Sequence, residues 1–215
     1  MSKPLYYTTV TKLLTKVLLQ LMASKEFADF RLVGGTALSL QIGHRESVDI
    51  DLFTDAEYGS IDFNALDAFL RSNYKYVDTN STGEVGMGTS YFIGNTKNEC
   101  VKLDIFYTDP FIEPILEIDN IRMASIEEII AMKLDVILRG GRKKDFWDIH
   151  ELTQKFSLKQ MLALHKKRYP YSHNAKKIKT NFTNFSEADN DFEPICLKQK
   201  YWEVIKLDLI DMANA

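Results

Sequence analysis

The sequence predicts an α+β core followed by a helical C-terminal part. Residues 9–28 place apolar side chains at the i, i+3, i+4 spacing of an amphipathic helix. Several short strand-like runs follow within the first 124 residues, separated by glycine and asparagine turns. After residue 124 the apolar spacing is helical. We therefore divide the chain into a core of residues 1–124 and a helical part of residues 125–215 that completes a cleft.

The elements of the core alternate between strand and helix signals. Leu32 and Val33 are predicted to form a short strand, and the turn Gly34–Gly35 leads into a short helix that Thr36 can cap. Asp62 can cap a further helix, whose apolar positions are 63, 66, 69 and 70. The remaining strands of the core are predicted at residues 48–53, 74–78, 89–93, 100–107 and 118–123.

The helical part begins with an S-x-x-E pattern. Ser125 and Glu128 predict a capping box, and the helix that they start runs to about Arg139 and ends at Gly140–Gly141. A second helix is predicted from about residue 143 to residue 156, followed by short helices. Residues 155–179 contain eight lysines and arginines and no acidic residue. This segment is either an ordinary solvated face or a basic patch for a polyanion.

The composition excludes several classes of protein. Hydrophobic residues make up 45% of the 215 residues and charged residues 27%, which is typical of a soluble globular protein. The formal net charge of −3 argues against a uniformly basic nucleic-acid-coating protein. Cys100 and Cys196 fit no metal-ligand spacing and are expected to be free thiols. Neither a signal-peptide pattern nor a run of 18 apolar residues occurs, so we expect a cytoplasmic protein without a membrane partner.

The strongest chemical signal is the D-x-D pair Asp49 and Asp51. Side chains at i and i+2 of a strand point to the same face, so these two carboxylates lie about 6–7 Å apart at Cα. Carboxylates this close repel each other unless a cation lies between them or one is protonated. A magnesium ion with oxygen ligands is the natural partner, and the alternative is a solvated surface strand.

Two further features support a site at this strand. The turn Gly34–Gly35 ends at a helix start, where free backbone N–H groups and the positive end of the helix dipole can hold phosphates. In the strand of residues 100–107, Asp104 lies on the face opposite to the apolar side chains. If this strand neighbours the D-x-D strand, Asp104 completes a three-carboxylate site; otherwise it is a surface aspartate.

Charged residues also interrupt the apolar faces of the two predicted C-terminal helices. At 100° per residue, Lys133 falls in the middle of the apolar stripe of the first helix, and Asp145 in that of the second. Buried charges need partners. Either Lys133 and Asp145 pair with each other, or Lys133 extends to solvent, or both line the cleft with Lys133 near a triphosphate.

The histidines carry a weaker signal. His44 lies in the motif region and is either a nucleotide or phosphate contact or a structural residue. We expect His150, His165 and His173 to be exposed. No H-x-x-x-H or C-x-x-C pattern indicates a zinc site.

The segments FRLVGGTALSLQIGHRESVDIDLF and MKLDVILRGGRKKDFWDIHEL together resemble the AbiEii/AbiGii-like abortive-infection nucleotidyltransferase toxins. The resemblance covers roughly residues 29–152. It implies a polymerase-β-like nucleotidyltransferase core, with a mixed sheet and flanking helices, followed by helices. It further implies transfer of a nucleotide from an NTP, dependent on one or two Mg²⁺ ions. Members are commonly the toxin half of a type IV toxin–antitoxin pair, and some modify tRNA.

The family's site residues match positions of this sequence one by one. Its metal carboxylates fall on Asp49 and Asp51, to which the strand argument adds Asp104. Its helical lysine and aspartate match Lys133 and Asp145. The resemblance assigns nucleotide binding to a further set, Gly34, Gly35, Thr36, Arg45 and Ser47, together with Lys133.

Two functional hypotheses follow from these patterns. The first is a pyrophosphate-releasing nucleotidyltransferase acting on an acceptor that is tRNA or a protein hydroxyl, neutralised in the cell by a cognate antitoxin. The second is an inactive nucleotide- or partner-binding module of the same fold. The intact D-x-D pair favours the enzyme, because an inactive copy has no need for two adjacent carboxylates.

Overall fold

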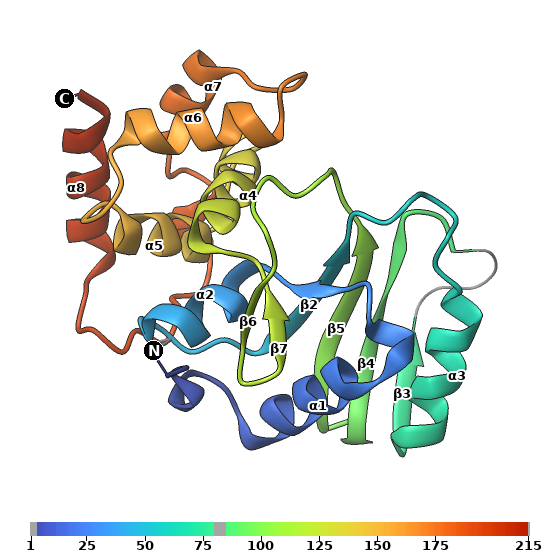
Figure 1. Cartoon of the computed structure of the whole chain (residues 1–215). Coiled ribbons are helices and arrows are strands. Elements are labelled where there is room, and N and C mark those ends of the chain that lie inside the picture. The colour runs from blue at the N-terminus through green and yellow to red at the C-terminus, as the bar shows by residue number, and fades with distance from the viewer. Residues whose placement is uncertain (1–3, 80–84, 215) are drawn as a thin grey trace.

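The computed structural model describes residues 4–79 and 85–214, which form a seven-stranded mixed sheet with flanking helices (Figure 1). The strand order is β3-β4-β5-β2-β1-β7-β6. The strands are β1 (Arg31–Leu32), β2 (Asp49–Thr54), β3 (Tyr76–Thr79), β4 (Gly88–Thr96), β5 (Glu99–Tyr107), β6 (Leu116–Ile118) and β7 (Ile121–Met123).

Helices precede, interrupt and follow the sheet. Short 3₁₀ turns lie at Tyr7–Thr9, Lys25–Phe27 and Ala188–Asn190. The α-helices are α1 (Lys12–Ala23), α2 (Gly34–Ile42), α3 (Phe63–Asn73), α4 (Ile126–Leu138), α5 (Lys143–Leu152), α6 (Leu158–Arg168), α7 (Ala175–Phe182) and α8 (Trp202–Asn214). The predicted change from α+β to helical structure after residue 124 is therefore confirmed.

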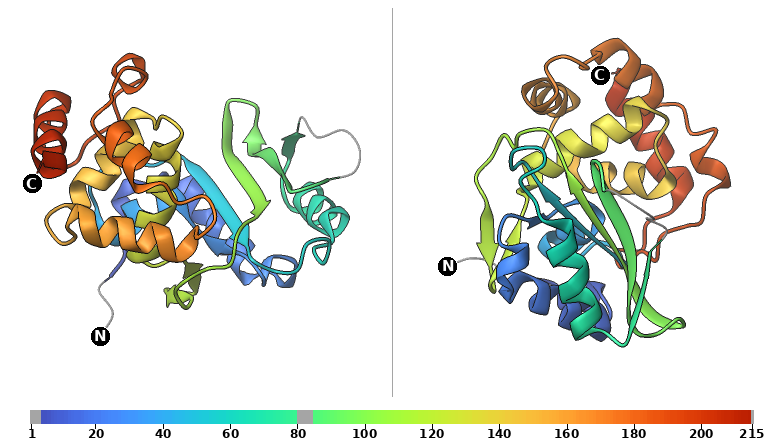
Figure 2. Two further views of the ribbon diagram at one scale, coloured as in Figure 1. Left: turned by 90° about the horizontal axis from the view of Figure 1, so that it is seen from above. Right: turned by 90° about the vertical axis from the view of Figure 1, so that its right-hand side faces the viewer.

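The sheet has one apolar face and one polar face at its centre. Along β2 and β5, buried residues alternate with half-buried ones, so that Ile50, Leu52, Leu103 and Ile105 enter the core. Helices α1 and α3 pack on this apolar side. The C-terminal helices gather beside α2, at the other side of the sheet (Figures 1 and 2). A single cluster of buried apolar residues joins residues before and after position 124.

Two predicted elements differ in the core. The predicted helix of residues 9–28 is shorter, because Thr11 caps α1 through a hydrogen bond from Leu14 N and the helix ends before Ser24. The single strand predicted at residues 118–123 is a hairpin of β6 and β7. Asp119 and Asn120 both take positive φ values, 53° and 61°, as a two-residue hairpin turn requires.

Two predicted caps are also corrected. Thr36 does not cap α2, which begins at Gly34 and therefore contains Thr36 within its first turn. Ser125 does cap α4, but the Glu128 side chain does not return to it. Instead Glu128 is fully buried, accepts hydrogen bonds from Ile112 N and Glu113 N, and pairs with Arg168.

The free state of Cys100 and Cys196 agrees with the expectation from the sequence. Of the helices in residues 4–79 and 85–214, none combines the length and the hydropathy that crossing a bilayer requires.

The pair of Glu128 and Arg168 predicts a large stability effect. Both side chains are fully buried, so Arg168→Met leaves the Glu128 carboxylate without its cation and should lower the free energy of unfolding by about 3–5 kcal/mol. In a thermal melt this corresponds to a loss of roughly 10 °C in Tm. The control is Lys167→Met, which removes an exposed ion pair with Glu113 and should change stability by less than about 1 kcal/mol. Equal Tm values for the two variants would contradict this role of Arg168.

Candidate active site

Three carboxylates meet at the polar face of the sheet. Strands β2 and β5 are parallel neighbours in a register that sets Asp51 opposite Asp104 and Asp49 opposite Lys102. The condition stated for Asp104, that its strand neighbours the D-x-D strand, is therefore met. Lys102 Nζ lies 2.5 Å from Asp104 Oδ2, and Lys144 Nζ of α5 lies 3.6 Å from Asp49 Oδ2.

The carboxylates are only partly compensated by these cations. Burial, followed by the charges of Asp104 and Asp49, raises the pKa of Asp51 from 3.8 to about 6. Lys133 and Lys144 act in the opposite direction but do not cancel this shift. The Oδ1 atom of Asp104 is buried and has no hydrogen-bond partner in the part of the chain that the structure describes.

The glycine turn brings the start of α2 against these side chains. Gly34 has a φ of 68°, and a Cβ atom there would lie 2.6 Å from Asp51 Oδ2. At Gly35 a Cβ atom would lie 2.4 Å from Arg45 Nη2. Only glycine therefore allows this close approach of the helix to both side chains. Thr36 binds the carbonyl oxygen of Asp49 and lies 2.8 Å from Ser47 Oγ, so it fixes the backbone that enters β2.

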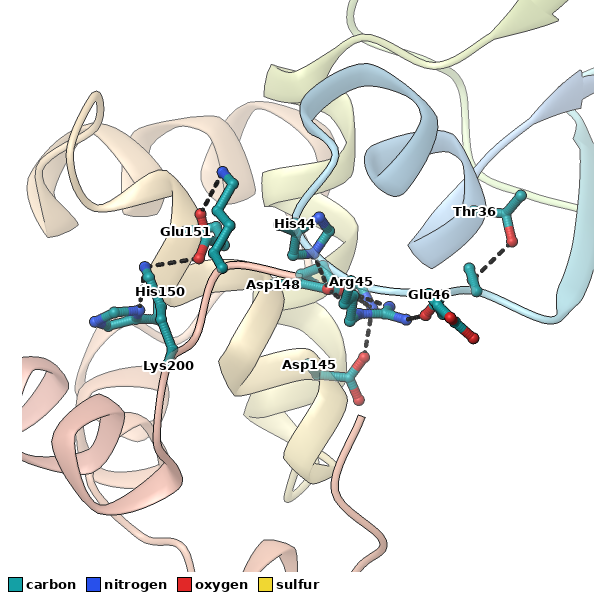
Figure 3. A network of polar contacts seen from close by, with 12 residues as sticks. Thr36, His44, Arg45, Glu46, Asp145, Asp148, His150, Glu151 and Lys200 are labelled. Atoms are coloured by element: carbon teal, nitrogen blue, oxygen red, sulfur yellow. Dashed lines mark hydrogen bonds and ion pairs between the residues drawn. The ribbon is translucent and has the colours of Figure 1, made fainter. Parts of the chain in front are cut away.

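A buried carboxylate, Asp148 of α5, connects the two sequence motifs (Figure 3). Its Oδ1 atom lies 2.6 Å from Arg45 Nε and 2.7 Å from His44 Nε2. Its Oδ2 atom lies 2.9 Å from Arg45 Nη2 and 2.7 Å from Lys133 Nζ. Lys133 and Arg45 hold the pKa of Asp148 well below its usual value, although burial alone would raise it. Sequence reasoning did not assign a role to Asp148, although it is the second aspartate of RKKDFWD.

Lys133 is paired as one of the sequence hypotheses predicted. Its Nζ lies 2.6 Å from Asp145 Oδ1, in addition to its contact with Asp148, and the side chain is almost fully buried. Asp145 Oδ2 also accepts a hydrogen bond from Arg142 N at the start of α5. The pKa of Lys133 is raised because the attraction of Asp145 and Asp148 outweighs the effect of burial, so it stays charged.

The histidines differ from the expectations. His44 is fully buried against Asp148, and burial lowers its pKa, so it is a neutral structural residue rather than an exposed nucleotide contact. His150 and His165 are buried, and the prediction that they are exposed is wrong. His150 contacts Asp208 and Lys200, and His165 contacts His173. A lone histidine gives no periodic signal, so these tertiary contacts could not be predicted.

Two of the predicted nucleotide-binding residues, Arg45 and Ser47, line a hollow together with Asp49. Arg45 and Ser47 are buried, and their polar atoms contact Asp148 and Thr36, respectively. A hollow of about 380 Å³ opens beside Asp49, and Lys144, Arg142 and residues 191–195 line its other sides. A second hollow of about 420 Å³ lies on the other side of the carboxylates, beside Lys102.

The described residues contain no group of three or more His, Cys, Asp or Glu side chains arranged to hold a metal ion as placed. The donors nevertheless suit a hard cation, because the negative charge at Asp51 is undercompensated and an oxygen of Asp104 is unpartnered. A cation that approaches Asp104 has to compete with Lys102.

The sheet, the glycine turn at the start of α2 and the D-x-D strand together define the polymerase-β-like nucleotidyltransferase fold. A model of the family described as nucleotidyl transferase AbiEii toxin, of type IV toxin–antitoxin systems, matches residues 16–214. The chain therefore belongs to the AbiEii nucleotidyltransferase toxin family, and the resemblance seen in the sequence is confirmed.

The chain is also similar to individual proteins and solved structures. An uncharacterised protein of Aquifex aeolicus is 31% identical over 189 residues, which is 83% of each chain. The crystal structure of JHP933 from Helicobacter pylori has a TM-score of 0.60 at 22% identity and covers 94% of this chain and 88% of its own. The nucleotidyltransferase toxin MenT4 of Mycobacterium tuberculosis has a TM-score of 0.51 at 13% identity, over 91% and 83% of the two chains. Both structures share the fold.

The pairing of Lys133 predicts how its variants behave. Lys133→Met leaves the buried Asp145 with only the exposed Arg142, whose Nε lies 3.7 Å from Oδ2, and should lower the free energy of unfolding by about 3–5 kcal/mol in chemical denaturation. The double variant Lys133→Met, Asp145→Asn should recover much of this loss, because Arg45 still neutralises Asp148. A single variant as stable as the wild type would show that these ion pairs do not contribute to folding.

The pKa of Asp51 predicts a pH dependence of stability in metal-free protein. Between about pH 4 and pH 6 the folded protein retains a proton that the unfolded chain has lost, so the free energy of unfolding falls as the pH rises through this window. Asp51→Asn removes this fall, by up to about 3 kcal/mol. Its Tm in EDTA should exceed that of the wild type by several degrees at pH 7.5 and approach it at pH 4.5. The exposed Asp29→Asn is the control, and a Tm difference independent of pH would refute the shift.

Proposed function

We propose that this nucleotidyltransferase moves a nucleotide from an NTP to an acceptor hydroxyl on tRNA or a protein, with Mg²⁺ held by Asp49, Asp51 and Asp104. The observation that carries the proposal is the undercompensated negative charge at Asp51, opposite the unpartnered Asp104 oxygen. Mg²⁺ bound to these carboxylates would neutralise phosphate charge and lower the pKa of the acceptor hydroxyl.

The residues around the carboxylates position the reacting groups. The acceptor oxygen forms a bond to the α-phosphorus while the bond between the α- and β-phosphates breaks, and pyrophosphate leaves. Asp104 takes the hydroxyl proton, provided that Lys102 moves from Asp104 to a phosphate. Lys144, which lies beside Asp49, binds the triphosphate through its positive charge. Because the side chain before α2 provides no cap, the first backbone N–H groups of α2 can donate to a phosphate as well.

The buried residues next to the site hold the three carboxylates in place. Lys133 is fixed between Asp145 and Asp148 and contributes positive charge near Asp51. Arg45 and Ser47 fix the segment that enters β2 and so set the position of Asp49. These residues therefore favour the phosphates mainly through electrostatics and positioning.

We further propose that the protein is the toxin of a two-gene pair, which a cognate antitoxin neutralises in the cytoplasm. Membership of a type IV toxin–antitoxin family supports this part of the proposal. The inactive binding module is disfavoured, because the D-x-D pair and its glycine turn are intact and in contact.

The proposal predicts the outcome of a label-transfer assay. Purified protein is incubated with each of the four α-³²P-labelled NTPs, Mg²⁺, and either total RNA or total protein of the host. Asp49→Asn and Asp51→Asn should keep the fold and reduce transfer at least about 10²-fold, because each removes a charge that aligns the α-phosphate. EDTA should have the same effect on the wild type.

Asp29→Asn serves as the matched control and should retain wild-type transfer, since Asp29 is exposed and outside the site. Circular dichroism and Tm verify folding. Wild-type transfer by either active-site variant would exclude these carboxylates from the reaction, and full activity in EDTA would exclude a divalent ion.

A further inference from the structure

The segment of residues 191–197, between α7 and α8, is fixed to the active site at both ends. At its start, Asp191 Oδ2 accepts a hydrogen bond from Lys143 N, in the first turn of α5. At its end, Glu46 N donates to Ile195 O and Leu197 N donates to His44 O, with a β-bridge between Arg45 and Cys196. The segment therefore runs antiparallel to residues 44–46, immediately before β2, and its backbone has little freedom to move relative to Asp49.

Within this fixed segment the ring of Phe192 is almost completely exposed. Its exposed fraction is 95%, although the residue lines the 380 Å³ hollow beside Asp49. Two residues further on, Pro194 restricts the backbone. A large aromatic side chain that stands uncovered on an anchored backbone gains free energy when a flat apolar ligand covers it. The position of the ring at the mouth of the candidate active site indicates a ligand of the reaction.

The hollow is lined by charges of both signs. Lys144 and Arg142 come from the start of α5, and the side chain of Arg142 is 63% exposed, whereas Arg45 is buried against Asp148. Besides Asp49, the acidic side chains are Asp191 and the exposed Glu46 and Glu193. Polyphosphate is attracted to the lysine and arginines and repelled by the acidic side chains, which can accept hydrogen bonds from hydroxyl or amino groups instead. The hollow therefore offers an aromatic surface, cationic side chains and hydrogen-bond acceptors around the carboxylate of Asp49.

We propose that this hollow binds the nucleoside triphosphate, with its base stacked on Phe192 and its phosphates beside Lys144 and Arg142. Phe192 is then a positioning residue that recognises the base as a flat ring, and the fixed segment of residues 191–197 anchors its backbone beside Asp49. Stacking tolerates every base, so Phe192 discriminates nucleotides from base-free polyphosphates rather than one base from another. This inference rests on the proposed function, and it assigns the donor nucleotide to one of the two hollows that flank the carboxylates.

The test is a binding measurement with and without the base. Isothermal titration calorimetry with Mg²⁺ uses the α,β-methylene analogues of the four NTPs, which cannot release pyrophosphate, and inorganic tripolyphosphate. Phe192→Ala should weaken binding of whichever analogues bind the wild type at least about fivefold, the low end of the stacking range, and leave tripolyphosphate binding unchanged. Phe192→Trp should restore analogue binding. Lys144→Met should weaken both kinds of ligand, because it removes a phosphate contact.

Two controls keep the result specific. Tyr171→Ala removes a ring that is equally exposed but does not line the hollow, and it should bind all ligands as the wild type does. Phe92→Ala removes an aromatic side chain from the second hollow, beside Lys102. Weaker analogue binding in Phe92→Ala, with normal binding in Phe192→Ala, would place the nucleotide on the other side of the carboxylates and overturn the inference.

The other outcomes are equally decisive. If the wild type binds an analogue and Phe192→Ala binds it with the same affinity, the platform is wrong while the proposed function stands. If Phe192→Ala instead loses only binding of the antitoxin or raises only the KM for the acceptor, a macromolecule covers the ring and the inference is overturned. If the wild type binds none of the four analogues, both the inference and the proposed NTP-dependent function fail.

Discussion

The site depends on the neutralisation of one buried carboxylate, that of Asp148. An unpaired charge at this depth would be very unfavourable, so its surroundings must supply compensating cations. Arg45 comes from the segment that enters β2, and Lys133 comes from α4. Together with Asp145, these four side chains carry no net charge, while His44 contributes a neutral hydrogen bond. This neutral cluster therefore sets the position of the D-x-D strand. The helical part supplies both of its carboxylates, Asp145 and Asp148.

The polar face of the sheet shows the opposite situation. Asp49, Asp51 and Asp104 bring three carboxylates together against Lys102 and Lys144, and the raised pKa of Asp51 reflects its burial together with the repulsion that remains. If cations of the protein neutralised all three carboxylates, the fold would be more stable, but the site would no longer attract a metal ion or its bound phosphates. The neutral cluster around Asp148 makes this arrangement tolerable, because it holds the backbone of β2 while the carboxylates on the polar face stay underneutralised.

The sequence predicted the parts of this arrangement that depend on local periodicity. Alternation along β2 placed Asp49 and Asp51 on one face, alternation along β5 placed Asp104 opposite the apolar side chains, and helical spacing located Lys133 and Asp145 within apolar stripes. Asp148 could not be assigned in this way, because its partners His44 and Arg45 lie 104 and 103 residues away in the chain. Phe192 lies in a segment without regular structure, so no periodic pattern indicates where its ring points.

The same contacts bear on the proposed division at residue 124. Apolar spacing suggests a sheet core of residues 1–124, yet Arg45 of that core has its carboxylate partner in α5. The hollow beside Asp49 likewise takes its lysine and arginine from the start of α5 and its aromatic ring from residues 191–195. A core without the helical part would keep the D-x-D strand and the glycine turn but would leave Arg45 without its carboxylate partner. The carboxylates therefore belong to the core in sequence, whereas the surroundings that orient them are shared by both parts of the chain.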